Sequence, residues 1–224
     1  MLHLFYETKI HDKKKAVCLV NEQSEVAILL AGPVLLGVLA LAPWVLILLY
    51  SSDFTAAATI LRWHILGDVL KIVSWPIGMI IVAAGHGRAL ILTEVGAVSV
   101  FVLVTWFGLP SMGVEVTGIA FFAMYAIHLV LVFWMGLKII GFRWTLVVKK
   151  YLIILFVLAC FTAGAAMSND ILGAVVGSCS AIVFGVISIN ALAKMAGMDR
   201  LMEKLFQVFN RIRKALRFKY DNKK

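Results

Sequence analysis

The chain has 224 residues, of which 62% are hydrophobic and only 15% are charged, and its formal net charge is +9. A soluble domain carries about a quarter charged residues, so this composition excludes an ordinary soluble fold. The sequence lacks the short alternating segments of a membrane β-barrel, and we therefore expect an all-α, polytopic bundle of membrane helices.

In chain order, residues 1–25 are rich in charge and lack the apolar core and cleavage site of a signal peptide, which predicts a cytoplasmic N-terminal segment. Residues 26–193 then contain apolar stretches of the length that a bilayer requires. We expect a lobe of about six spanning helices, at 26–50, 64–84, 89–108, 117–137, 151–167 and 171–193. A five-span arrangement with 151–193 partly re-entrant is the alternative.

Lysine and arginine are distributed unequally between the expected loops. The N-terminal segment, the loops 85–88 and 138–150, and the tail 194–224 carry nearly all of them, whereas the opposite loops hold only Arg62. Cytoplasmic loops are enriched in these residues, so both termini are expected in the cytoplasm. The positive charge is therefore a topology signal and not an indication of nucleic-acid binding.

The basic tail contains an amphipathic pattern from Met198 to Lys219, with apolar residues at helical spacing and basic residues on the other faces. Such a helix lies on an anionic membrane surface. It is expected to anchor the tail to membrane lipid, or alternatively to bind a regulatory partner.

The second expected span carries polar residues at membrane depth. His64, Asp68, Lys71 and Trp75 follow one another at intervals that place them on one helical face. We expect this face, with Arg62, to line a hydrophilic path that attracts an anionic head group. The competing interpretation is a neutralised Asp68–Lys71 pair that only holds the bundle together.

Glu94 in the third span and His128 in the fourth are the other titratable residues at membrane depth. Counted from the expected helix ends, Asp68, His128 and Glu94 lie at different levels of the bilayer, which favours a translocation path over one catalytic centre. Glu94 could instead reach lipid head groups.

Enzyme signatures are missing from the sequence, which has no paired-aspartate metal motif, phosphate-binding glycine loop or supported catalytic triad. The three cysteines have no metal-binding spacing. We expect no catalysis, no metal and no cofactor.

Several motifs together resemble the O-antigen translocase and lipid III flippase family, in the multidrug/oligosaccharidyl-lipid/polysaccharide exporter superfamily. The resemblance covers about 45–140. It is carried by Leu49-Tyr50-Ser51-Ser52-Asp53-Phe54, Leu61-Arg62-Trp63, Gly67-Asp68-Val69-Leu70-Lys71, Ser74-Trp75-Pro76-Ile77-Gly78, Ala83-Ala84-Gly85, Glu94, and Gly113 to Gly118-Ile119-Ala120 with Tyr125.

The resemblance implies a bacterial inner-membrane flippase that moves undecaprenyl-pyrophosphate-linked oligosaccharide by alternating access through a cationic central cavity. It also implies twelve helices in two lobes, and it makes Arg62, Asp68, Lys71 and Glu94 the residues carried over. Six spans are about half of that. The chain is therefore expected to be a C-terminal portion, from a truncated reading frame or partial gene, completed by a missing N-terminal lobe or a second copy.

Three alternatives stay open. The first is an exporter of drugs or other small molecules from the same superfamily. The second is a non-transporting membrane remnant of a truncated gene, and the third is a membrane-embedded glycosyl or acyl transferase.

Overall fold

The computed structural model describes residues 2–197, with side chains described from residue 13 onward except at positions 52 and 56. Every regular element in this range is a helix, as the composition predicts. The predicted amphipathic helix of the tail lies outside the described residues. The elements are α1 (Leu2–Ala40), α2 (Ala42–Leu49), η1 (Ser52–Ala57), α3 (Ala58–Ala83), α4 (Gly87–Met112), η2 (Gly113–Glu115), α5 (Val116–Ile140), α6 (Leu146–Ser168) and α7 (Asp170–Met195).

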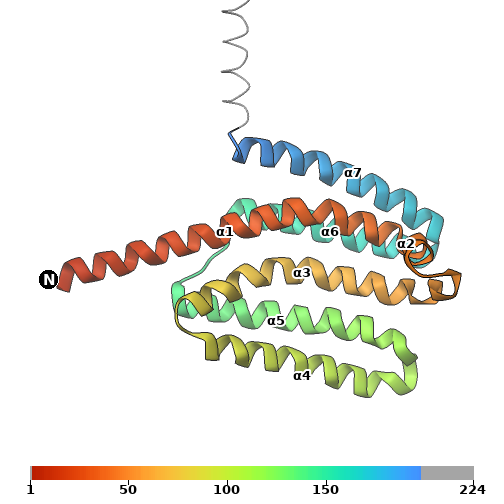
Figure 1. The fold of residues 1–224 in the computed structure, drawn as a ribbon, viewed down its shortest axis with the longest axis horizontal. Coiled ribbons are helices and arrows are strands. Elements are labelled where there is room, and N and C mark those ends of the chain that lie inside the picture. Colours follow the sequence, from red (N-terminus) through yellow and green to blue (C-terminus); the bar gives the residue numbers. More distant parts are fainter. Residues whose placement is uncertain (1, 198–224) are drawn as a thin grey trace, which may run out of the picture. The chain divides into compact units, whose positions relative to one another are not determined.

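Residues 1–185 form one compact unit. Within it, α3 packs against α1 and α5, α5 packs against α4, and α1 packs against α6 (Figure 1). The described part of the second unit, residues 186–197, consists of the last turns of α7 and the residues that follow them.

Within residues 2–197, five uninterrupted helical stretches are long and apolar enough to cross a membrane. The stretch from Gly87 to Ile140 has 54 residues, which would measure about 80 Å as one straight helix, far more than a bilayer core. It folds back as an antiparallel hairpin of α4 and α5 (Figure 1). Gly113, at φ +61°, stands at the bend, where a side chain would be strained. The protein is thus a multi-pass membrane bundle whose five stretches supply six long helices.

The expected first span, 26–50, is wrong in its boundaries. One helix, α1, runs from Leu2 to Ala40, and the part of it that fits a membrane is Lys13–Ala40. Charged side chains before residue 26 mark a polar environment but do not interrupt a helix. The chain breaks at Leu41 because Pro43 occupies the first turn of α2, where its missing N–H costs least.

A one-residue turn joins α6 to α7. Helix α6 ends at Ser168 and α7 begins at Asp170. Between them, the Asn169 Oδ1 atom accepts a hydrogen bond of 2.8 Å from the backbone N–H of Ile171 and thereby caps α7.

Small residues in α7 allow close packing at two positions. A Cβ atom added to Gly177 would collide with Ala40 of α1 and Thr162 of α6, and one added to Gly173 would collide with Ala166. At Gly185 the nearest atom would be 3.8 Å away, so that position is not tightly packed.

Helix α3 supplies much of the core. Its side chains at Ile65, Val69, Val73 and Ile77 are buried and recur every four residues, which is the spacing of one helical face. They pack with buried residues of α1, α5 and α6. This leaves another face of α3 free for polar residues.

Candidate functional site

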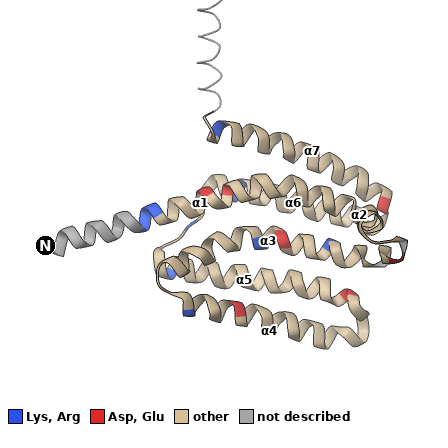
Figure 2. Cartoon of the chain, viewed as in Figure 1, with Lys and Arg blue, Asp and Glu red and all other residues tan. Residues whose placement is uncertain are grey.

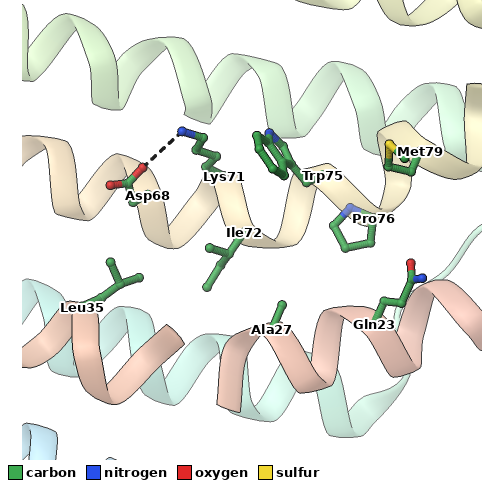
Figure 3. A pocket seen from close by; sticks show the side chains of 9 residues that line it. All are labelled: Gln23, Ala27, Leu35, Asp68, Lys71, Ile72, Trp75, Pro76 and Met79. Atoms are coloured by element: carbon green, nitrogen blue, oxygen red, sulfur yellow. Dashed lines mark ion pairs between the residues drawn. The ribbon is translucent and has the colours of Figure 1, made fainter. Parts of the chain in front are cut away.

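The polar face of α3 borders a groove between α1 and α3. The groove has a volume of about 440 Å³. Figure 3 shows Asp68, Lys71 and Trp75 on its α3 side. Its full lining is Gln23, Ala27 and Leu35 from α1 and Asp68, Lys71, Ile72, Trp75, Pro76 and Met79 from α3. Two charged residues therefore stand in a mainly apolar groove at membrane depth.

The ammonium group of Lys71 is held mainly by aromatic rings. Its Nζ atom lies 5.5 Å from the ring centre of Trp75, 5.4 Å from that of Tyr125 and 5.9 Å from that of Phe121. We call these three rings the Lys71 cage. Such cation–π contacts stabilise a positive charge without neutralising it. The Asp68 Oδ1 atom is 3.7 Å away, which is an ion pair too long for a strong hydrogen bond (Figure 3).

His64, the first residue of the predicted face, is tied to the same cluster. Its ring stacks on Phe121 with ring centres 4.3 Å apart, and its Nδ1 atom lies 2.9 Å from the Ile60 carbonyl oxygen. Phe121 in turn contacts Tyr125, and Tyr125 contacts His128 edge to face. A continuous row of rings therefore runs along α5 beside the polar face of α3.

His128 and Glu94 form a pair in the structure. The His128 Nε2 atom lies 3.2 Å from the Glu94 Oε1 atom, and the His128 Nδ1 atom lies 3.3 Å from the Ser74 Oγ atom. The side chain of His128 is 2% exposed and that of Glu94 is 54% exposed. Helices α3, α4 and α5 thus meet at this point.

The expectation that Glu94 and His128 lie apart at different depths is therefore wrong. Counting the rise per residue from the expected helix ends separates their Cα levels by about 5 Å, which the reach of the two side chains can close. Asp68 remains separate, in the groove with Lys71.

Arg62 does not join the polar face of α3. It lies about 200° around the helix from His64, at 100° per residue. Its side chain is buried and its Nη2 atom forms an ion pair of 2.5 Å with the Asp170 Oδ1 atom at the start of α7. This contact fixes α3 to α7 within the first unit, so Arg62 has a structural role here.

Sequence reasoning did not select Phe121, Tyr125 or Ser74 as site residues. Phe121, Tyr125 and His128 are spaced four and three residues apart, which places them on one face of α5. That spacing was the signal in the sequence that could have placed Phe121 and Tyr125 beside His128. In the part of the chain that the structure describes, no three His, Cys, Asp or Glu side chains gather to hold a metal ion.

Basic residues gather at one end of the first unit and acidic residues at the opposite end. Lys13, Arg88 and Lys138 lie at one end, where the Lys13 Nζ atom donates to the Ile139 carbonyl oxygen at 3.2 Å. Glu115 and Asp170 lie at the other end, in the bend between α4 and α5 and at the start of α7 (Figure 2).

Comparison with characterised proteins finds a partial similarity. The chain is 30% identical over 81 residues to the lipid III flippase of Escherichia coli (strain K12), and equally to the lipid III flippase of Shigella flexneri. The similar stretch is 36% of this chain and spans 20% of the length of each of these relatives. No family model matches the chain, and no solved structure matches it.

Proposed function

We propose that this chain is one lobe of a transporter that flips a lipid-linked oligosaccharide from the cytoplasmic to the periplasmic leaflet of a bacterial inner membrane. Lys71 carries this proposal. A charge at the centre of a bilayer costs about 2.5–3.5 kcal/mol on insertion scales, and such charges usually serve a function. The Lys71 ammonium is held by rings and only loosely paired with Asp68, so it can still attract an anion.

The groove suits a pyrophosphate-linked lipid better than a free ion. Lys71 offers a positive charge to phosphate oxygens, while Leu35, Ile72 and Met79 offer apolar contacts for a prenyl chain. The partial similarity to lipid III flippases supports a substrate of this class.

Transport requires a second half. Alternating access depends on the movement of one repeat or bundle against another, and the described residues that line the groove come from α1 and α3. We propose that a second copy of this chain or a separately encoded lobe covers it. The concentration of lysine and arginine near Lys13, Arg88 and Lys138 supports a cytoplasmic location for that end of the bundle.

A leaflet-transfer assay tests the proposal. The chain would be reconstituted in vesicles with a polyprenyl-pyrophosphate-linked sugar that carries a fluorophore, and a membrane-impermeant reductant would report the fraction in the outer leaflet. We expect transfer by the unmodified chain and by Lys71→Arg, and at least a tenfold slower transfer by Lys71→Gln, since an ion pair of about 4 Å contributes a few kcal/mol before screening.

Lys149→Gln, an exposed lysine on α6 outside the groove, is the matched control. Equal transfer by Lys71→Gln and Lys149→Gln would remove the role assigned to Lys71. If the chain instead transfers a lipophilic cation, and Asp68→Asn abolishes that transfer, the result would favour an exporter of drugs or other small molecules. Binding without transfer would indicate that a separately encoded lobe is required, and a lack of both would indicate a non-transporting remnant.

A further inference from the structure

The hydrogen bonds of Ser74 depend on the protonation of His128. The Ser74 hydroxyl donates to the Lys71 carbonyl oxygen at 2.9 Å. A hydroxyl has one hydrogen, so while it donates to this carbonyl its oxygen accepts the contact from the His128 Nδ1 atom, which lies 3.3 Å away. In this arrangement Nδ1 carries a hydrogen, and a neutral His128 would then have none on Nε2.

This arrangement places two acceptors against each other. Without its hydrogen, Nε2 is an acceptor, and it faces the Glu94 Oε1 atom at 3.2 Å. An ionised carboxylate is also an acceptor, so the contact with the buried Nε2 atom would be repulsive. A proton on either atom turns the contact into an attraction.

We propose that His128 and Glu94 form a proton-binding site that couples proton movement to substrate movement. This inference rests on the proposed transport function. When loaded, His128 is an imidazolium with a hydrogen on both ring nitrogens, and its Nε2–H faces the Glu94 carboxylate. When unloaded, the ring has one hydrogen fewer. Loading takes that proton from a hydronium ion and leaves a water molecule, and release reverses the step.

The exposure of the two residues provides a route for the proton. His128 is 2% exposed, whereas Glu94 is 54% exposed and lines a hollow of about 620 Å³ along α4. Because it is exposed, the Glu94 carboxylate can receive a proton and pass it to Nε2 while the other hydrogen of His128 is on Nδ1.

The surroundings of His128 link the proton to the groove. From α3, Ser74 bonds both to His128 and to the Lys71 backbone, and from α5, Tyr125 contacts both the His128 ring and the Lys71 ammonium. From α4, the charged residue that faces His128 is Glu94. From α1, the Lys13 Nζ atom donates to the Ile139 carbonyl oxygen of α5.

Release of the proton changes the hydrogen bond to Lys71. The stable neutral form beside an ionised Glu94 has its hydrogen on Nε2, which leaves Nδ1 as an acceptor. Ser74 must then turn its hydroxyl toward Nδ1 and away from the Lys71 carbonyl. Loading also adds a positive charge near the groove, so it strengthens binding of an anion, and anion binding strengthens proton uptake by the same factor.

Nitrogen NMR of the full chain tests the proton site directly. The chain would be labelled with ¹⁵N-histidine, embedded in lipid nanodiscs and titrated from about pH 5 to pH 9, a range that covers histidine protonation. The His128 signal is assigned by its loss in His128→Asn. We expect it to change from an imidazolium to the Nε2–H tautomer as the pH rises, and to titrate at a lower pH in Glu94→Gln. A neutral His128 over the whole range, or an identical titration in Glu94→Gln, would overturn the proposal.

Calorimetry with farnesyl pyrophosphate, in buffers of different ionisation enthalpy, tests the coupling. We expect the unmodified chain to take up more protons on binding than Glu94→Gln, while Ser99→Ala, which alters an exposed hydroxyl in the same hollow, behaves as the unmodified chain. Binding with equal uptake in Glu94→Gln would refute the coupling and leave the proposed function intact. No binding by the unmodified chain would refute the proposed function, and the NMR titration would still decide the proton site.

Discussion

The substitution Asp68→Asn separates an anion-binding groove from a structural ion pair. Asp68 is the carboxylate beside Lys71, with its Oδ1 atom 3.7 Å from Nζ. If the pair only holds the bundle together, removal of the Asp68 charge destabilises the fold and does not tighten ligand binding. If the groove receives a phosphate, the same change removes a repulsive charge next to the ligand and tightens binding.

The size of the gain follows from the geometry. A phosphate within about 4 Å of Nζ, on the side away from Asp68, would lie about 7 Å from the carboxylate, a repulsion of roughly 2 kcal/mol at an effective dielectric constant of 20. The Lys71 and Asp68 side chains are 31% and 34% exposed, so water and salt reduce this value to about 1 kcal/mol. That corresponds to about fivefold tighter binding.

Calorimetry with farnesyl pyrophosphate in nanodiscs would measure this change. Glu115→Gln is the matched control because Glu115 is an exposed carboxylate in η2, outside the groove. The expected result is tighter binding by Asp68→Asn and unchanged binding by Glu115→Gln. Weaker binding by Asp68→Asn would mean that Asp68 positions Lys71 or contacts the ligand itself, and would refute the reasoning.

Three further substitutions test the packing, each measured as the free energy of unfolding in a mixed-detergent titration. Gly118→Ala places a methyl group 2.9 Å from a backbone oxygen of α3 and should lower the free energy of unfolding by about 1–3 kcal/mol. The control Gly164→Ala has open space around it and should change stability little. Equal effects of the two substitutions would contradict the close contact at Gly118. Asn21→Ala removes hydrogen bonds of 2.8 Å and 3.1 Å that hold the loop before α6 and should cost about 1–3 kcal/mol, and an unchanged stability would refute that role. Asp170→Asn leaves the buried Arg62 guanidinium without its counter-charge and should lower the free energy of unfolding by about 1–3 kcal/mol. The loss is smaller than for a fully buried pair because Asp170 is 56% exposed. An unchanged stability would show that water replaces the carboxylate.

Hydropathy and turn residues predicted most of the fold. The long apolar stretches locate the helices, because a bilayer permits little else, and Gly113 and Asn169 mark two bends in the chain. Helix α1 begins far earlier than residue 26 because hydropathy locates the membrane boundary, whereas helix ends depend on caps and prolines.

The candidate site was only partly visible in the sequence. The spacing of Asp68, Lys71 and Trp75 was sufficient to place them together, because they lie on one helix. The Lys71 cage and the His128–Glu94 pair form only because α5 packs against α3 and α4. Residue spacing within one helix does not reveal which helices pack together, so the sequence could not predict these contacts. Arg62 lies on the wrong side of α3 for the groove, a fact that its helical angle already indicated.

Photo-crosslinking would show whether the groove beside Lys71 binds a pyrophosphate-linked lipid. A polyprenyl pyrophosphate with a photoreactive group next to its head would be irradiated with the reconstituted chain, and the modified residues identified by mass spectrometry. We predict adducts at Gln23, Trp75 and Met79 in the groove, which disappear with excess unlabelled lipid and in Lys71→Gln. Adducts spread over exposed positions of α4 such as Trp106 and Phe107, and unaffected by competitor or by Lys71→Gln, would contradict the account.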